Sequence, residues 1–315
     1  MITAKARDKI SAANFLLFPF SKTMIPTLNP ATAGSGLALP DYIALAKNHG
    51  FSAIEFSIGE AAELVEKTGF DAVASLFNES KILPITFGLP VEWRKDEDTF
   101  QSGLAELSQQ AKLAQDLGCS RCVTWVLPDN GEPLAEYSGR SLKRFQQIGK
   151  VLEDQGVRLG LEFIGPMHFR TDSQNVWFYD IPGALHVVGQ IEDGAELENV
   201  GLLVDCFHWY TSGGTMMDLA SIPLEKIVHV HINDAPDMPA GMQNDAIRLL
   251  PGESGTIDIV GFLGTLGALG YDGPVAVETF SEELRALSPD EAASRAAVAV
   301  AGVLNAAKIE TVRLL

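Results

Sequence analysis

The sequence predicts an α/β fold, a single-domain (β/α)8 TIM barrel spanning residues 1–315. Strand-like and helix-like segments alternate from one end of the chain to the other, as βα units do around a parallel sheet. Helix-to-strand turns are short and marked by glycine, whereas strand-to-helix connections are long. Long loops at the carboxyl ends of barrel strands usually carry the active site. A doubly wound open sheet is the alternative, but no glycine-rich phosphate-binding turn follows the first predicted strand.

Eight apolar runs of strand length occur along the chain. The predicted strands are Asn14–Phe20, Ser52–Ser57, Ile82–Phe87, Arg121–Val126, Arg158–Phe163, Val200–Asp205, Ile227–Ile232 and Val275–Thr279. Four predicted helices between them are Pro40–Asn48, Phe100–Leu117, Leu142–Asp154 and Ile257–Leu269. The long connections are Ser21–Leu39, Leu127–Gly139, Ile164–Asp180 and Asn233–Thr256.

The last helix has a clear start in the sequence. Ser288 is its expected N-cap, Pro289 stands at the first helical position, and Glu291 completes a capping box. We expect this helix to end near Ala307. Cys119 and Cys122 form a lone C-x-x-C pair, which we interpret as structural because no second pair completes a zinc site.

The composition describes a globular protein with a large core, 46% hydrophobic and 20% charged. The formal charge of −18 disfavours nucleic acid as a partner and favours a site that attracts cations. No segment approaches the roughly 18 apolar residues that span a bilayer, so we expect no membrane partner. A secretory signal is also not expected, because the apolar run from Phe15 to Phe20 is short, and the location predicted is the reducing cytoplasm.

Four consecutive predicted strands carry an acid or a histidine at the last or the last but one position. Glu162, Asp205 and Glu278 are acids, and His231 is an imidazole. Successive side chains of a strand point to opposite faces. In each of these strands one face is wholly apolar and suits packing against helices, and the other face carries both apolar and polar residues. The polar residue near the strand end lies on this second face. All four therefore face the barrel interior at its carboxyl end. For His231, this assignment places His229 inward and Val228 outward.

Three carboxylates and one imidazole form a hard, oxygen-rich set of ligands. Such a set predicts one divalent metal ion, with Mn²⁺ preferred over Mg²⁺ or Co²⁺ and structural zinc disfavoured. Two coordination positions would remain for water or a chelating substrate.

At this point the sequence resembles the xylose isomerase-like TIM barrels, a superfamily of sugar isomerases, keto-sugar epimerases and inosose dehydratases that also includes endonuclease IV. The resemblance covers nearly the whole chain and is strongest from Gly160 to Phe280. The segments that carry it are Leu161-Glu162-Phe163, Asp205-Cys-Phe-His208, His229-Val-His231-Ile-Asn-Asp234, Leu250-Pro-Gly-Glu-Ser-Gly255 and Val277-Glu278.

The resemblance implies that Glu162, Asp205, His231 and Glu278 bind the ion, and that Glu162 and Glu278 also act as acid and base on opposite faces of the substrate. His208 would face the substrate oxygens and stabilise developing charge; otherwise it stacks among the aromatic residues of the barrel mouth. Two departures from the epimerase pattern are His168, where a second Glu is expected, and Asp237, where an Arg is expected.

Four further residues are candidates for substrate binding, each with an ordinary alternative. Arg248 either reaches the substrate or is a plain loop arginine. His168 is either an added base, which suits a lyase, or a surface histidine. Glu55 hydrogen-bonds a metal ligand or the substrate, or pairs with an arginine. Trp125, like other aromatic residues at the mouth, either stacks on a sugar ring or packs within its loop.

The predicted function is a divalent-metal-dependent isomerase or epimerase of a sugar or polyhydroxy carbonyl compound, acting through an enediolate. The runner-up on the same site is a keto-sugar lyase, with His168 or His208 as added acid or base. An abasic-site endonuclease is disfavoured because no histidine lies between Phe51 and Met167, and a non-catalytic binding barrel is a further alternative. The expected partner is a small sugar or polyol, and a homo-oligomer is compatible with the sequence.

Overall fold

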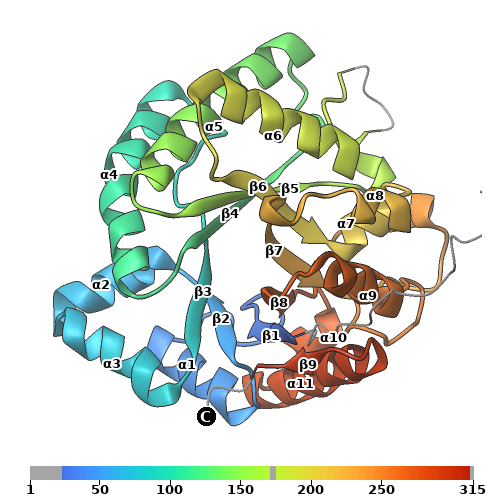
Figure 1. The fold of residues 1–315 in the computed structure, drawn as a ribbon. Helices are drawn as coiled ribbons and strands as arrows, with labels where there is room; N and C mark the ends of the chain where they lie inside the picture. Colours follow the sequence, from blue (N-terminus) through green and yellow to red (C-terminus); the bar gives the residue numbers. More distant parts are fainter. Residues whose placement is uncertain (1–22, 171–174, 313–315) are drawn as a thin grey trace, which may run out of the picture.

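The strands form a closed parallel barrel, as predicted (Figure 1). The computed structural model describes residues 23–170 and 175–312. Each strand pairs with the next along the chain, and β1 closes the ring by pairing with both β8 and β2. The strands are β1 Thr23–Leu28, β2 Ala53–Phe56, β3 Leu83–Gly88, β4 Arg121–Val126, β5 Arg158–Phe163, β6 Val200–Asp205, β7 Ile227–Ile232 and β8 Pro274–Val277, and the short β9 Glu310–Thr311 pairs with the start of β1.

Helices surround the barrel and cover the outer faces of its strands (Figure 1). The α-helices are α1 Leu39–Asn48, α2 Ile58–Thr68, α3 Phe70–Ser80, α4 Glu97–Asp116, α5 Leu134–Glu153, α6 Ile181–Ala195, α7 Cys206–Thr211, α8 Met216–Ala220, α9 Ile259–Leu269, α10 Glu282–Arg285 and α11 Pro289–Ala306. Short 3-10 helices are η1 Met167–Phe169, η2 Leu224–Lys226 and η3 Ala240–Met242. The predicted capping box of Ser288 and Glu291 starts α11.

The first barrel strand is displaced from its predicted position. The run predicted as a strand, Asn14–Phe20, lies outside the described residues, and β1 lies in the segment predicted as a connection. The segment contains Pro26, as the predicted run contains Pro19, and a proline cannot donate to the ladder. Here only one donor is lost, since the Pro26 carbonyl still accepts from the Ser52 N–H at 3.0 Å.

Two further differences arise from local packing. Helix α5 begins at Leu134, eight residues before its predicted start, so the loop after β4 is shorter than expected. Strand β7 carries an irregularity opposite Leu203, which pairs with His229 and skips Val228. The assignment of Val228 to the outer face was therefore wrong: a β-carbon added at Gly160 would lie 3.2 Å from Val228 Cβ, so Val228 also fills the interior.

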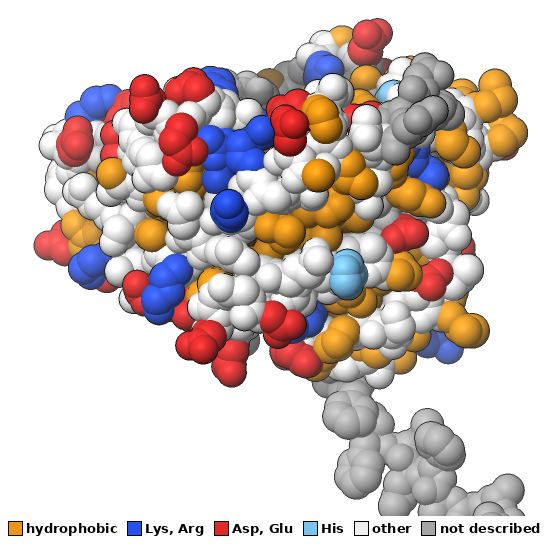
Figure 2. Space-filling model, turned by 90° about the horizontal axis from the view of Figure 1, so that it is seen from above, with side chains coloured by type: hydrophobic (Ala, Val, Ile, Leu, Met, Phe, Trp, Pro, Cys, Tyr) orange, Lys and Arg blue, Asp and Glu red, His pale blue; other side chains and the backbone are white. Residues whose placement is uncertain are grey.

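The surface and the cysteines agree with a large, well-packed barrel. Charged side chains of both signs are interspersed over the face in Figure 2, with apolar side chains between them. Cys119 and Cys122 are buried free thiols, which supports their structural interpretation. Among the described residues, no helix has the length and apolarity needed to cross a bilayer.

Candidate functional site

The four polar strand ends meet at the carboxyl end of the barrel. Glu162 is the last but one residue of β5, Asp205 ends β6, His231 is the last but one residue of β7, and Glu278 directly follows β8. One ligand atom from each of the four lies within 4.8 Å of the others. His231 Nδ1 lies 3.8 Å from Glu162 Oε1, 3.7 Å from Asp205 Oδ2 and 3.3 Å from Glu278 Oε2. The barrel thus brings all four predicted ligands together.

Two atoms of this cluster fit a metal ion particularly well. Glu162 Oε1 and His231 Nδ1 are buried, and neither has a hydrogen-bond partner in the described structure. A buried polar atom left unsatisfied costs about 1–3 kcal/mol. A divalent cation would satisfy both atoms and balance the carboxylates around them, so the donor set fits the ion that the sequence predicts.

Glu55, on β2, pairs with the ring nitrogen of His231 that faces away from the other three predicted ligands. Its Oε1 lies 2.9 Å from Nε2 of both His231 and His229, and its Oε2 accepts from Asn29 Nδ2 at 3.1 Å. A carboxylate at Nε2 keeps a ring proton there and turns Nδ1 of His231 toward the three carboxylates of the cluster. Of the alternatives left open by the sequence, the geometry favours a hydrogen bond to a ligand.

Replacing Glu55 by glutamine is therefore expected to weaken metal binding without emptying the cluster of ligands. Second-layer partners of this kind are worth about 10- to 100-fold in metal affinity. Calorimetric titration with Mn²⁺ measures the change. The matched control is Glu79→Gln on the exposed side of α3, which should leave the affinity unchanged; equal affinities in the two variants would contradict the role of Glu55.

Asp205 is fully buried and serves several groups at once. Its Oδ1 accepts from the Phe207 N–H at 2.6 Å and so caps the short helix α7. Asn233 Nδ2 lies 3.3 Å from both oxygens, and Arg248 Nη1 donates to Oδ2 at 2.9 Å. The carboxylate is consequently fixed in position before any ion arrives.

Arg248 reaches the centre although it lies in a long loop. Its Nη1 also donates to Glu278 Oε2 at 2.6 Å, and only 2% of its side chain is exposed. The loop is held by Asp234, whose carboxylate accepts backbone N–H bonds from Ser254, Gly255 and Ile257. Backbone hydrogen bonds between Asp234 and Leu249 fix the chain next to Arg248. The interpretation as an ordinary loop arginine does not describe this position.

His208 lies buried between the ligands and the arginine. The Gly165 N–H donates to Nδ1 at 3.2 Å, while Nε2 lies 3.1 Å from Arg248 Nη2 and 3.7 Å from Glu162 Oε1. Burial and the nearby charge of Arg248 lower the pKa of His208, so the ring is neutral at pH 7. A neutral imidazole accepts at only one nitrogen, so it cannot satisfy both donors.

The two glutamates of the cluster have opposite proton affinities in the metal-free protein. Burial and the negative charges of Glu278 and Asp205 raise the pKa of Glu162 well above its ordinary value. Burial alone would also raise the pKa of Glu278, but the charges of His231 and Arg248 outweigh burial and lower it to about 2. Neighbouring carboxyl groups whose pKa values differ in this way are typical of acid–base sites.

Metal binding is expected to strengthen as the pH rises. Since Glu162 holds a proton above the usual carboxylate range, an incoming cation must displace it, and affinity increases by up to about tenfold per pH unit while the group remains protonated. Calorimetry with Mn²⁺ between pH 5 and 7, in buffers of different ionisation enthalpy, should detect the released proton. A pH-independent affinity with no proton release would contradict this assignment.

The remaining candidates lie at the rim. Trp125, on β4, pairs in register with Glu162, and its side chain is 44% exposed, but the Arg94 guanidinium stacks over the indole at 3.5 Å. His168 is exposed on η1, and its ring packs on Phe169 with centroids 4.1 Å apart. Contact of either residue with a substrate stays a prediction.

Three polar residues of the site were missed by the sequence reasoning: Asn29, Asn233 and Asp245. Parity places Asn233 inward with His231, but it does not reveal the contact of Asn233 with Asp205. Asn29 follows β1 directly, and so was hidden by the misplaced first strand. Asp245 lies in the long loop after β7, where nothing in the sequence distinguishes it from other acids; its Oδ1 accepts from Arg248 Nη2 at 2.6 Å.

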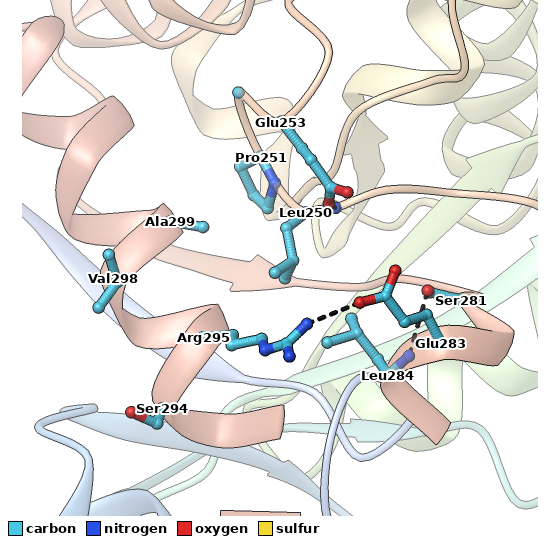
Figure 3. Close-up of a pocket in the computed structure, with 11 residues that line it drawn as sticks. Leu250, Pro251, Glu253, Ser281, Glu283, Leu284, Ser294, Arg295, Val298 and Ala299 are labelled. Carbon is cyan, nitrogen blue, oxygen red and sulfur yellow. Dashed lines mark hydrogen bonds and ion pairs between the residues drawn. The ribbon is translucent and has the colours of Figure 1, made fainter. Parts of the chain in front are cut away.

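A separate cavity of about 480 Å³ lies outside the ligand cluster. Figure 3 shows Leu250 and Pro251 on one side and Val298 and Ala299 of α11 on the other, with the ion pair of Glu283 and Arg295 between α10 and α11. The four ligands are not among its lining residues. The cavity is therefore distinct from the cluster of four predicted metal ligands.

Characterised relatives share most of the chain. The inosose isomerase of Halalkalibacterium halodurans is 26% identical over 267 residues, which covers 84% of this chain and 90% of the relative. A 3-dehydroshikimate dehydratase of Pseudomonas putida is 27% identical over 197 residues, covering 60% of this chain and 28% of the much longer relative.

Solved structures show the same fold. A xylose isomerase domain protein from Alicyclobacillus acidocaldarius superimposes with a TM-score of 0.81 at 30% identity, over 91% of this chain and all of that one. The IOLI protein with a binding zinc atom superimposes with a TM-score of 0.74 at 24% identity, over 90% and 98% of the two chains. The model of the xylose isomerase-like TIM barrel family matches residues 43–302. The chain belongs to the xylose isomerase-like TIM barrel family.

Proposed function

We propose that this protein is a divalent-metal-dependent isomerase or epimerase of a polyhydroxy ketone, such as a ketose or an inosose. The observation that carries the proposal is the convergence of Glu162, Asp205, His231 and Glu278 with two buried ligand atoms unpaired. The relatives named for an inosose, an uncharged polyhydroxy ketone, support this substrate class.

The ion would supply positive charge to a carbonyl oxygen and a neighbouring hydroxyl oxygen, which makes the adjacent C–H bond more acidic. We propose manganese, because hard oxygen ligands predominate in the cluster. The zinc in the IOLI structure is the other candidate, and metal analysis of the purified protein distinguishes them.

Glu162 and Glu278 are the proposed acid–base pair. They extend from β5 and from the end of β8, with β6 and β7 between them, so they approach a bound substrate from different sides. The ionised carboxylate removes a proton to form an enediolate, and the other group returns a proton to the opposite face or to the neighbouring carbon.

His208 and Arg248 are proposed to hold the substrate oxygens. Their facing nitrogens are 3.1 Å apart, and the imidazole has too few acceptors for the donors around it. A substrate oxygen placed between Nε2 and Nη2 would accept from both groups and relieve this mismatch. Donors fixed in advance at such an oxygen stabilise the charge that develops there.

A lyase is the second candidate, favoured by the match to a dehydratase. The two reactions are separated by product mass: isomerisation leaves the mass unchanged, whereas elimination loses water or an aglycone. We expect a mass-resolved screen of ketoses, inososes and 3-keto-glycosides with Mn²⁺ to yield an isomer of unchanged mass. Loss of water would favour the dehydratase, and no conversion of any member would contradict both.

A further inference from the structure

A further carboxylate, that of Asp245, lies at the rim of the centre, outside the four ligand positions. Asp245 Oδ1 accepts from Arg248 Nη2 at 2.6 Å and lies 3.7 Å from His208 Nε2. The Asp245 side chain is 24% exposed, compared with 2% for Arg248 and 1% for His208. The acid thus lies between solvent and the two groups that are proposed to hold substrate oxygens.

Neighbouring aromatic rings and carboxylates restrict the hydrogen-bond partners that the Arg248 guanidinium can reach. Its guanidinium carbon lies 5.0 Å from the ring centroid of Phe207 and 4.6 Å from that of Phe280. Its Nη1 uses oxygens of Asp205 and Glu278 that a metal ion would also bind. Once an ion draws on those oxygens, Asp245 is the carboxylate beside Arg248 that keeps its full charge for the arginine.

The charges around the centre disfavour an anionic ligand. Five carboxylates surround it: Glu55, Glu162, Asp205, Asp245 and Glu278. One guanidinium, that of Arg248, and one divalent ion leave two negative charges when the histidines are neutral. Because the groups are largely buried, salt screens their repulsion of an additional anion only weakly.

We propose that Asp245 makes this site selective for an uncharged polyhydroxy ketone, by occupying the position at which a substrate carboxylate would pair with Arg248. A neutral substrate accepts hydrogen bonds from Arg248 and His208 without displacing Asp245, whereas a keto acid must compete with it. This inference rests on the proposed function for the location of the substrate, and it names the substrate class.

Binding of a matched pair of sugars tests the inference. D-fructose and D-fructuronate differ by one terminal group, a hydroxymethyl against a carboxylate. Their affinities for the manganese-loaded protein are measured by calorimetry in the unmodified protein, in Asp245→Asn and in Asp237→Asn. Asp237 is an exposed acid in the same loop, so its replacement removes one charge without touching Arg248.

We expect the unmodified protein to bind D-fructose at least tenfold more tightly than D-fructuronate. Asp245→Asn should raise the affinity for D-fructuronate at least tenfold and change the affinity for D-fructose by less than threefold. Asp237→Asn should have the affinities of the unmodified protein. Asp245→Ser is the second variant, should the asparagine form fail to fold.

Four results would overturn the inference: preference of the unmodified protein for D-fructuronate, no measurable binding of D-fructose, equal shifts in the Asp245 and Asp237 variants, or preferential turnover of a keto acid. Failure of the proposed function has a different signature. If the product screen finds no conversion but the Asp245 variant shifts the binding ratio as expected, the reaction is wrong and the charge selection stands. Turnover of a keto acid in preference to neutral ketoses would leave the reaction class intact and remove the selection.

Discussion

Replacing Glu162 or Glu278 by glutamine is expected to lower kcat by about 10⁴-fold, the upper range for loss of a positioned acid or base. Each glutamine preserves size and keeps one acceptor oxygen but cannot carry a proton between substrate carbon and solvent. Turnover of the ketose or inosose found in the screen measures this loss at saturating Mn²⁺, with bound metal quantified in the same samples so that loss of the ion is not mistaken for loss of the base.

The two variants should also differ from each other. With a base on each side of the substrate, Glu278→Gln retains exchange of the substrate proton that Glu162 reaches, and Glu162→Gln retains the exchange at Glu278. Incorporation of deuterium from solvent, followed by mass spectrometry, detects these half-reactions. Glu79→Gln is again the control. Normal turnover in both active-site variants would contradict an acid–base role for these two glutamates.

Asp205→Asn is expected to abolish the stabilisation that a metal ion gives the folded protein. For the unmodified protein, Mn²⁺ at 1,000 times its dissociation constant adds about 4 kcal/mol to the free energy of unfolding. The asparagine can still cap α7 through its carbonyl oxygen, but it removes a charged ligand and turns an N–H group toward Arg248 or the ion. Thermal unfolding with and without Mn²⁺ measures the difference in Tm.

The metal-free Asp205 variant provides its own control. Loss of the ion pair with Arg248 destabilises the variant, whereas weaker repulsion among the remaining carboxylates stabilises it. Without metal, its Tm should therefore differ little from that of the unmodified protein, and the larger difference should appear in the Tm increase that Mn²⁺ produces. A Tm increase in Mn²⁺ equal to that of the unmodified protein would show that Asp205 is not a ligand.

The ligand cluster could be predicted because barrel strands convert sequence into position by simple rules. Parity along β5 to β8 places Glu162, Asp205 and His231 on one face, and the parallel arrangement brings their carboxyl ends to one edge. The irregularity at Val228 changes the facing of one residue without disturbing His229 or His231, because the register recovers at Leu203. The predicted convergence of the residues at the strand ends is therefore confirmed, although the predicted facing of Val228 within β7 was wrong.

The residues that were misjudged depend on tertiary contacts. Both the predicted run and the first strand contain a proline, Pro19 and Pro26, and the run just before the strand is more apolar and so matched the strand pattern better. The position of Arg248 depends on how Asp234 gathers three backbone N–H groups from its loop, and no local propensity encodes that path. Asp245 acquires its role only because this loop folds back over the barrel mouth.

The most direct test of the metal centre is the anomalous scattering of manganese in crystals of the protein grown with Mn²⁺. We predict one strong peak within coordination distance of Glu162, Asp205, His231 Nδ1 and Glu278. A peak bound elsewhere, or none at this position with the metal in excess, would contradict the site on which the proposed chemistry depends.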